Sequence, residues 1–156
     1  MIGIRSTTLV MVMGLAVALV AGAAWAQDSA LVGRWHWNQA KSTLPPGATA
    51  PKDVVSEISR ADGGAVSWSV TIVTPDNQRH VMTFKAGADP ERVASDTTAS
   101  ARLSGDTLQT TFNGDAGQSD VLTCSVSANH DQMTCKGVLS DGRGHSVYYV
   151  DVYDRV

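Results

Sequence analysis

Short segments in which apolar and polar residues alternate run through most of the chain after residue 30. The clearest covers residues 65–74, whose apolar side chains all fall on one face: Val66, Trp68, Val70 and Ile72. A period of two is that of a β-strand with one buried face, and no window after residue 30 shows a convincing helical period. The pattern therefore predicts an all-β protein.

Nine such segments are separated by turns rich in Gly, Asp, Asn and Pro, and each predicts a strand. They cover residues 31–37, 54–60, 65–74, 79–86, 98–103, 107–113, 119–127, 132–139 and 145–153. Most links between them are so short that neighbouring strands must be antiparallel. The proline-rich residues 44–51 and the polar residues 87–96 are expected to be loops. An up-and-down meander of about 8–10 strands follows.

An open sheet of this size would expose two strand edges, and curling it until the first and last strands pair removes them. We therefore expect an antiparallel barrel, with a β-sandwich as the alternative. A barrel of this strand number can hold one small ligand in its lumen.

Alternation also selects side chains for that lumen. His80 shares a strand face with Met82 and Phe84, and on the last segment His145 shares a face with Tyr149. An inward histidine can act as an acid–base group, and a tyrosine can stack and donate a hydrogen bond. The same residues also suit plain core or strand positions. The candidate ligand-binding residues are Trp68, His80, Phe84 and Tyr149.

The two cysteines, Cys124 and Cys135, test this layout. If residues 128–131 form a four-residue turn, Ser127 lies opposite Gln132 and counting back three positions brings the cysteines opposite each other. Opposed residues at a non-hydrogen-bonded site have the Cβ separation that a disulfide needs. We expect a disulfide that contributes about 2–3 kcal/mol. A metal pair or a free thiol is the alternative, but no C-x-x-C or zinc-like histidine spacing accompanies the cysteines.

The first 26 residues have the features of a signal peptide. Arg5 precedes an apolar run over residues 9–22, and Ala24-Trp25-Ala26 supplies small residues at the two positions that a signal peptidase reads. The run is shorter than a membrane-spanning helix needs, which argues against the alternative of an N-terminal anchor. We expect cleavage between Ala26 and Gln27, a single barrel domain over residues 27–156, and a periplasmic or secreted product without stable membrane insertion.

Charge and motifs narrow the function further. The chain has 12 Lys and Arg against 15 Asp and Glu, without a basic stripe, so nucleic acid is not an expected partner. No P-loop, G-x-G-x-x-G, H-E-x-x-H or G-x-S-x-G motif is present. We therefore expect no cofactor and no metal site. Carboxylates such as Asp120 and Asp151 are present, but the sequence does not place any two of them together, and the catalytic residues of any enzyme stay unknown.

Residues 33–42, GRWHWNQAKS, run into a Pro-Pro-Gly and Ala-Pro-Lys connector, and the chain closes with DGRG at residues 141–144 and VYDR at residues 152–155. These segments resemble a family of small secreted bacterial lipocalin-like proteins whose mature chains begin G-x-W-x-x-N-x-x-K-S. The order of strands and turns agrees over nearly the whole mature length. The resemblance implies an antiparallel barrel with Trp35 packed across one end. It implies no activity, because the family is mostly uncharacterised, and the cysteine pair is not part of its usual pattern.

Three functions remain open from the sequence. The leading hypothesis is an exported lipocalin-like module that binds a small apolar or amphipathic molecule in the barrel. The first alternative is an envelope protein-binding module, such as an inhibitor of a foreign hydrolase, that uses residues 44–51 or 87–96. The second is a lyase or isomerase with His80 or Tyr149 as acid–base groups.

Overall fold

The computed structural model describes residues 29–62 and 64–156, and all ten strands of that part belong to one antiparallel β-sheet. The strands lie in the order β4-β3-β2-β1-β10-β9-β8-β7-β6-β5. Their bounds are β1 Gly33–Trp37, β2 Asp53–Ala61, β3 Val66–Val73, β4 Arg79–Ala86, β5 Glu91–Arg92, β6 Thr98–Ser104, β7 Thr107–Asn113, β8 Ser119–Val126, β9 Gln132–Ser140 and β10 Ser146–Arg155. Two short 3₁₀ helices, η1 Gln39–Lys41 and η2 Asp115–Gly117, lie in connections. The expected all-β meander is confirmed, whereas the predicted signal peptide lies outside the described residues.

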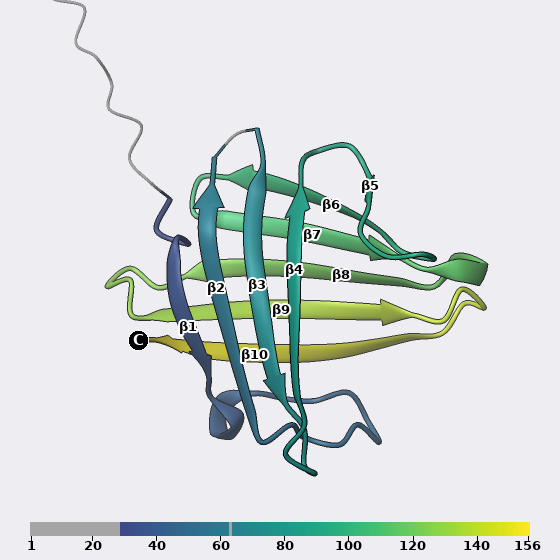
Figure 1. Cartoon of the computed structure of the whole chain (residues 1–156), viewed down its shortest axis with the longest axis horizontal. Coiled ribbons are helices and arrows are strands. Elements are labelled where there is room, and N and C mark those ends of the chain that lie inside the picture. Colours follow the sequence, from purple (N-terminus) through teal and green to yellow (C-terminus); the bar gives the residue numbers. More distant parts are fainter. Residues whose placement is uncertain (1–28, 63) are drawn as a thin grey trace, which may run out of the picture.

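The sheet curls on itself into a nearly closed barrel. Strands β1 to β4 form a layer that crosses in front of β6 to β10 (Figure 1). The first and last strands do pair, since β1 runs antiparallel to β10. The seam lies instead between β4 and the β5–β6 edge, where Ala101 N donates to Gly87 O at 2.6 Å. The expected barrel is therefore present, with its open edge between the fourth strand and the fifth and sixth.

Residues 87–96 are not entirely a loop, as the sequence had suggested. Glu91 and Arg92 form β5 and pair with Ala99 and Thr98 of β6. A two-residue strand is too short to show alternation, so the pattern carried no signal for it. The last strand also begins one residue later than expected, because His145 lies in the loop that starts at Asp141.

One end of the barrel is closed by Trp35. Its ring is fully buried, and its Nε1 donates to Leu31 O at 2.8 Å. The Arg155 guanidinium lies 4.1 Å from the Trp35 ring centre and donates to backbone carbonyl oxygens of Ala30, Val32 and His130. A Cβ at Gly33 would overlap that guanidinium, which explains why glycine stands there. The expected packing of this tryptophan across one end is thus what the structure shows.

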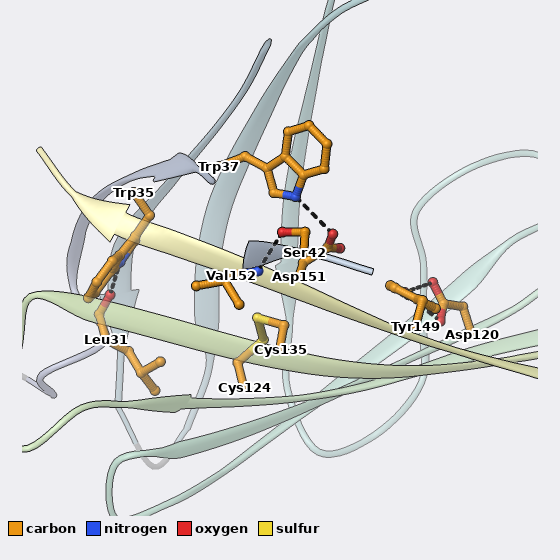
Figure 2. Close-up of a disulfide and its surroundings, with 10 residues drawn as sticks. All are labelled: Leu31, Trp35, Trp37, Ser42, Asp120, Cys124, Cys135, Tyr149, Asp151 and Val152. Atoms are coloured by element: carbon orange, nitrogen blue, oxygen red, sulfur yellow. Dashed lines mark hydrogen bonds between the residues drawn. A yellow bond between two sulfur atoms is a disulfide. The ribbon is translucent and has the colours of Figure 1, made fainter. Parts of the chain in front are cut away.

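The disulfide is confirmed in the predicted register. Cys124 and Cys135 face each other across β8 and β9 and are bonded. Ser127 N donates to Gln132 O at 2.8 Å, which fixes the four-residue turn between them. Both sulfurs belong to buried residues, so the bond forms part of the inner wall of the barrel (Figure 2).

The inner face follows the predicted alternation on β3 and at the end of β4, whereas His80 and Met82, expected to face inward from the start of β4, are exposed. Trp68 pairs with Phe84 across the two strands, and their rings stack with centres 5.1 Å apart. Phe112 of β7 meets Phe84 edge-on at 5.4 Å, so this aromatic cluster joins the two layers. Over residues 29–62 and 64–156, no helix has the length and apolar character that crossing a membrane requires.

Candidate ligand-binding site

The barrel encloses an inner chamber of about 80 Å³ beside the disulfide. Most of its wall is apolar and comes from both layers: Ile58, Trp68, Val70, Leu108, Leu122, Cys124, Met133 and Cys135. The remaining lining residues each carry a hydroxyl: Ser56, Thr110 and Tyr153. The chamber is therefore an apolar space with a few polar groups, which is the usual composition of a small-molecule site.

The three hydroxyls make no hydrogen bond to any side chain or backbone group of the described residues. Ser56 and Thr110 are only 8% and 6% exposed, and burial holds the pKa of Tyr153 well above its usual range, so its phenol stays protonated. Every side-chain nitrogen or oxygen that the described residues fully enclose has a partner. The oxygens of Ser56, Thr110 and Tyr153 therefore open onto the chamber. Because these oxygens open onto the chamber, water or a polar group of a bound molecule can complete their hydrogen bonds there.

A larger pocket of about 430 Å³ lies at the open end of the barrel, where η2 and the β9–β10 loop meet (right in Figure 1). We call it the mouth. Its apolar lining comes from Phe112, Leu139 and Val147, and its polar lining includes Asp120, Asp141 and His145. The His145 ring bonds Asp141 at 2.8 Å and holds the pKa of that carboxyl below its usual range.

Asp120 lines the mouth and is bonded to Tyr149 of β10. The Tyr149 hydroxyl donates to Asp120, with both carboxylate oxygens 2.9 Å away (Figure 2). To reach β8 from β10, the Tyr149 ring lies flat across β9 over Gly137, where any Cβ would collide with it. Gly137 is therefore part of the site, because it leaves the space that the ring occupies.

A second carboxylate, that of Asp151, lies next to Tyr149 on the inner face of β10. Its Oδ1 accepts a hydrogen bond from Trp37 Nε1 at 2.9 Å (Figure 2). Burial raises the pKa of both Asp120 and Asp151, and the charge of Asp151 adds to the rise at Asp120. Burial, together with the nearby Asp120, also raises the pKa of Tyr149, so that this phenol stays a donor. The carboxylates of Asp120 and Asp151 can thus accept a hydrogen bond from a ligand or attract a cationic group of it.

Of the four candidate residues, the structure brings Trp68 and Phe84 together, and only Trp68 lines one of the two cavities. Trp68 lines the chamber, Phe84 stacks on Trp68, and Tyr149 lines neither cavity but bonds to Asp120 of the mouth. His80 lies on the predicted inner face of β4, but its side chain is exposed and lines neither cavity. His145 does not share the inner face with Tyr149; it borders the mouth from a loop, with its side chain 83% exposed.

Sequence reasoning missed the polar members of the site. Asp120 lies on the same face of β8 as Leu122 and Cys124, so the period of two already predicted that it points inward. Nothing in the sequence shows that Tyr149 reaches it, because that contact crosses β9 and depends on Gly137. Ser56 and Thr110 resemble ordinary strand residues, and only the shape of the barrel shows that their hydroxyls lack partners.

Known structures with the same architecture are lipocalin- and fatty-acid-binding-like barrels, whereas no family model and no curated protein matches the sequence. The fluorescent protein UnaG superimposes with a TM-score of 0.56 at 18% identity, over 81% of this chain and 97% of that one. A point mutant of UnaG gives 0.59 at 16% identity, over 81% and 96%. The zebrafish ileal bile acid-binding protein, complexed with cholic acid, gives 0.51 at 18% identity, over 82% and 100%. At these identities the likeness establishes the fold: this chain is a lipocalin-like barrel.

Proposed function

We propose that the protein is an exported lipocalin-like module that binds one small apolar or amphipathic molecule inside its barrel. The observation that carries the proposal is the inner chamber, whose buried hydroxyls on Ser56, Thr110 and Tyr153 have no partner among the described residues. A side chain packed only for stability would gain by being apolar at Ser56 or Thr110. Hydroxyls at these positions make sense if an occupant completes their hydrogen bonds.

The size of the two cavities suggests how such a molecule lies. A water molecule occupies about 30 Å³ of liquid, so the chamber of about 80 Å³ alone holds only a small group. The mouth of about 430 Å³ has the dimensions of a small-molecule site. Thr110 lines the chamber and Phe112, the next inward residue of β7, lines the mouth. One ligand would therefore place a polar group in the chamber and its larger part in the mouth.

Two further observations support the proposal. A barrel of the same fold, the zebrafish bile acid-binding protein, is known in complex with an amphipathic molecule, cholic acid. The signal-like residues 1–26 and the Cys124–Cys135 bond both suit a protein that matures in an oxidising compartment outside the cytoplasm. We propose that the mature chain begins at Gln27.

Native mass spectrometry of the protein purified from its own host tests this function. We expect a mature chain starting at Gln27 and a bound species of small mass that is lost on unfolding. The variant Thr110→Val, which removes one chamber hydroxyl at nearly constant volume, should retain less of that species. Its matched control is Thr134→Val. Thr134 is partly exposed on β9 and lies between the inward Met133 and Cys135, so its side chain points away from the lumen. Equal retention by both variants, or wild-type protein without any bound species, would contradict the proposal.

A further inference from the structure

We propose that the ligand is a small aromatic amine that also carries a hydroxyl group, with its ammonium held between Asp120 and Phe112. This inference rests on the proposed function and names the chemical class of the bound molecule. It follows from the charges of the lumen, from the placement of its aromatic rings and from the buried hydroxyls of the chamber.

Asp120 and Phe112 form a suitable site for an ammonium group. They are direct partners across β7 and β8 on the inner face, and both line the mouth. A carboxylate offers about four acceptor positions, of which the single Tyr149 proton uses only part. An aromatic face beside a carboxylate attracts a cation both through the ring and through the charge. A ligand ammonium in the mouth can therefore contact both groups.

Among the residues that the structure describes, no lysine or arginine lies close enough in the lumen to neutralise these carboxylates. On the described strands, lysines and arginines other than Arg155 lie on the outer face or are exposed. Arg155 lies at the closed end, where backbone carbonyls and the Trp35 ring take up its guanidinium. His145 at the mouth is bonded to Asp141, and the side chain of His80 is exposed. An anionic ligand would meet Asp120 and Asp151 without a counter-charge, whereas a cation would compensate a buried charge.

The aromatic cluster and the chamber define the rest of the molecule. Trp68 lines the chamber and Phe112 lines the mouth, and the Phe84 ring contacts both of these rings. A ligand that reached from one cavity into the other would therefore lie against aromatic rings. Thr110 lies two residues before Phe112 on β7, which is about 7 Å along a strand. A hydroxyl about 7 Å from the ammonium would reach the partnerless oxygens of Thr110, Ser56 and Tyr153. An arylalkylamine with a ring hydroxyl has this spacing.

Three matched probes test the charge: tyramine, tyrosol and 4-hydroxyphenylacetate, which share a phenol and differ in an ammonium, a hydroxyl or a carboxylate at the other end. Isothermal titration calorimetry on the mature protein at neutral pH should show tyramine binding at least tenfold more tightly than tyrosol. The carboxylate probe should bind most weakly. Phenethylamine, which lacks the phenol, should lose at least fivefold relative to tyramine because it leaves the chamber hydroxyls unpaired.

The variant Asp120→Asn assigns the preference to one residue. It keeps an acceptor for the Tyr149 hydroxyl and removes the charge, so tyramine affinity should fall at least tenfold, and the affinity for uncharged tyrosol should fall by a clearly smaller factor. Asp106→Asn, the same change in the exposed β6–β7 turn at the opposite end of the barrel, should alter neither.

The outcomes separate the two proposals. If tyrosol or the carboxylate binds as tightly as tyramine, the barrel binds small molecules but the amine inference is wrong. If Asp120→Asn keeps the preference of the wild type for the amine, Asp120 is not its site. If none of the probes binds at millimolar concentration while native mass spectrometry finds another bound molecule, only the inference fails. If neither method finds a ligand, both proposals fail. The wild-type comparison stands even if Asp120→Asn proves unstable.

Discussion

The two ends of the barrel use the same kinds of side chain in opposite ways. At the closed end, the Trp35 indole and the Arg155 guanidinium have their donors bonded to backbone carbonyls, and the tryptophan is fully buried. Elsewhere in the lumen, Asp120 at the open end is half-buried with Tyr149 as its partner, and the chamber hydroxyls, one of them on Ser56 directly opposite Trp35, have none among the described residues. Complete pairing indicates a role in stability, whereas incomplete pairing of buried polar groups indicates a role in binding.

The strongest test of this contrast is Trp35→Ala. The change removes a fully buried ring from the closed end, so it should lower the free energy of unfolding by about 3–5 kcal/mol. Tyr148→Ala is a matched control, because that aromatic ring is exposed on the outer face and should contribute less than about 0.5 kcal/mol. Denaturant unfolding of both variants measures the difference. Similar losses would show that Trp35 does not hold the end of the barrel closed.

The disulfide lies between the two ends, in the wall of the chamber, and should have the next largest effect. Replacing Cys124 and Cys135 by Ala should lower the free energy of unfolding by about 2–4 kcal/mol, because the unfolded chain gains conformational entropy without the bond. The β-rich circular dichroism spectrum should stay unchanged. Thiol labelling of denatured, unreduced protein from the cell envelope should find no free thiol. Two free thiols there would contradict the proposed compartment.

Changes at Phe84, which stacks on Trp68 of the chamber, and at Tyr149, which bonds to Asp120 of the mouth, should affect binding more than folding. Phe84→Ala and Tyr149→Ala should each weaken the binding of tyrosol by about 1–3 kcal/mol through lost apolar contact. Tyr149→Phe is the matched control for the ring, because it keeps the packing over Gly137 and removes only the donor to Asp120. If Phe84→Ala and Tyr149→Ala instead cost about 3–5 kcal/mol of stability and the wild type binds nothing, these residues are ordinary core.

The sequence was a better guide to the strands and their register than to the binding site. Alternation placed Trp68 and Phe84 on one face, and the length of one turn set the cysteine register, because both depend on residues close together along the strands. The binding site depends on contacts between strands that share no local pattern. Tyr149 reaches Asp120 only because Gly137 lacks a side chain, and His80 faces inward by period yet lies where the opposite layer does not cover it. The period of two predicts on which face of its strand a residue lies, but not which residues of the opposite layer contact it.

The smallest expected effect is also the one that separates stability from binding most directly. Burial and the nearby Asp151 raise the pKa of Asp120 in the folded protein, so the folded state binds its proton more tightly than the unfolded state does. Stability should therefore fall as the pH rises from about the ordinary carboxyl value of 3.8 through the raised value, and stay lowered above it. Asp120→Asn removes this titration and should be equally stable or more stable than the wild type at neutral pH, by less than about 1 kcal/mol because the group is partly solvated. Urea unfolding of both proteins between pH 4 and about 8 measures the difference, and Asp106→Asn should follow the wild type. A variant that unfolds more easily than the wild type at neutral pH would show that Asp120 stabilises the barrel. A variant that is at least as stable but binds amines poorly would show that the carboxylate is kept at the open end for its ligand.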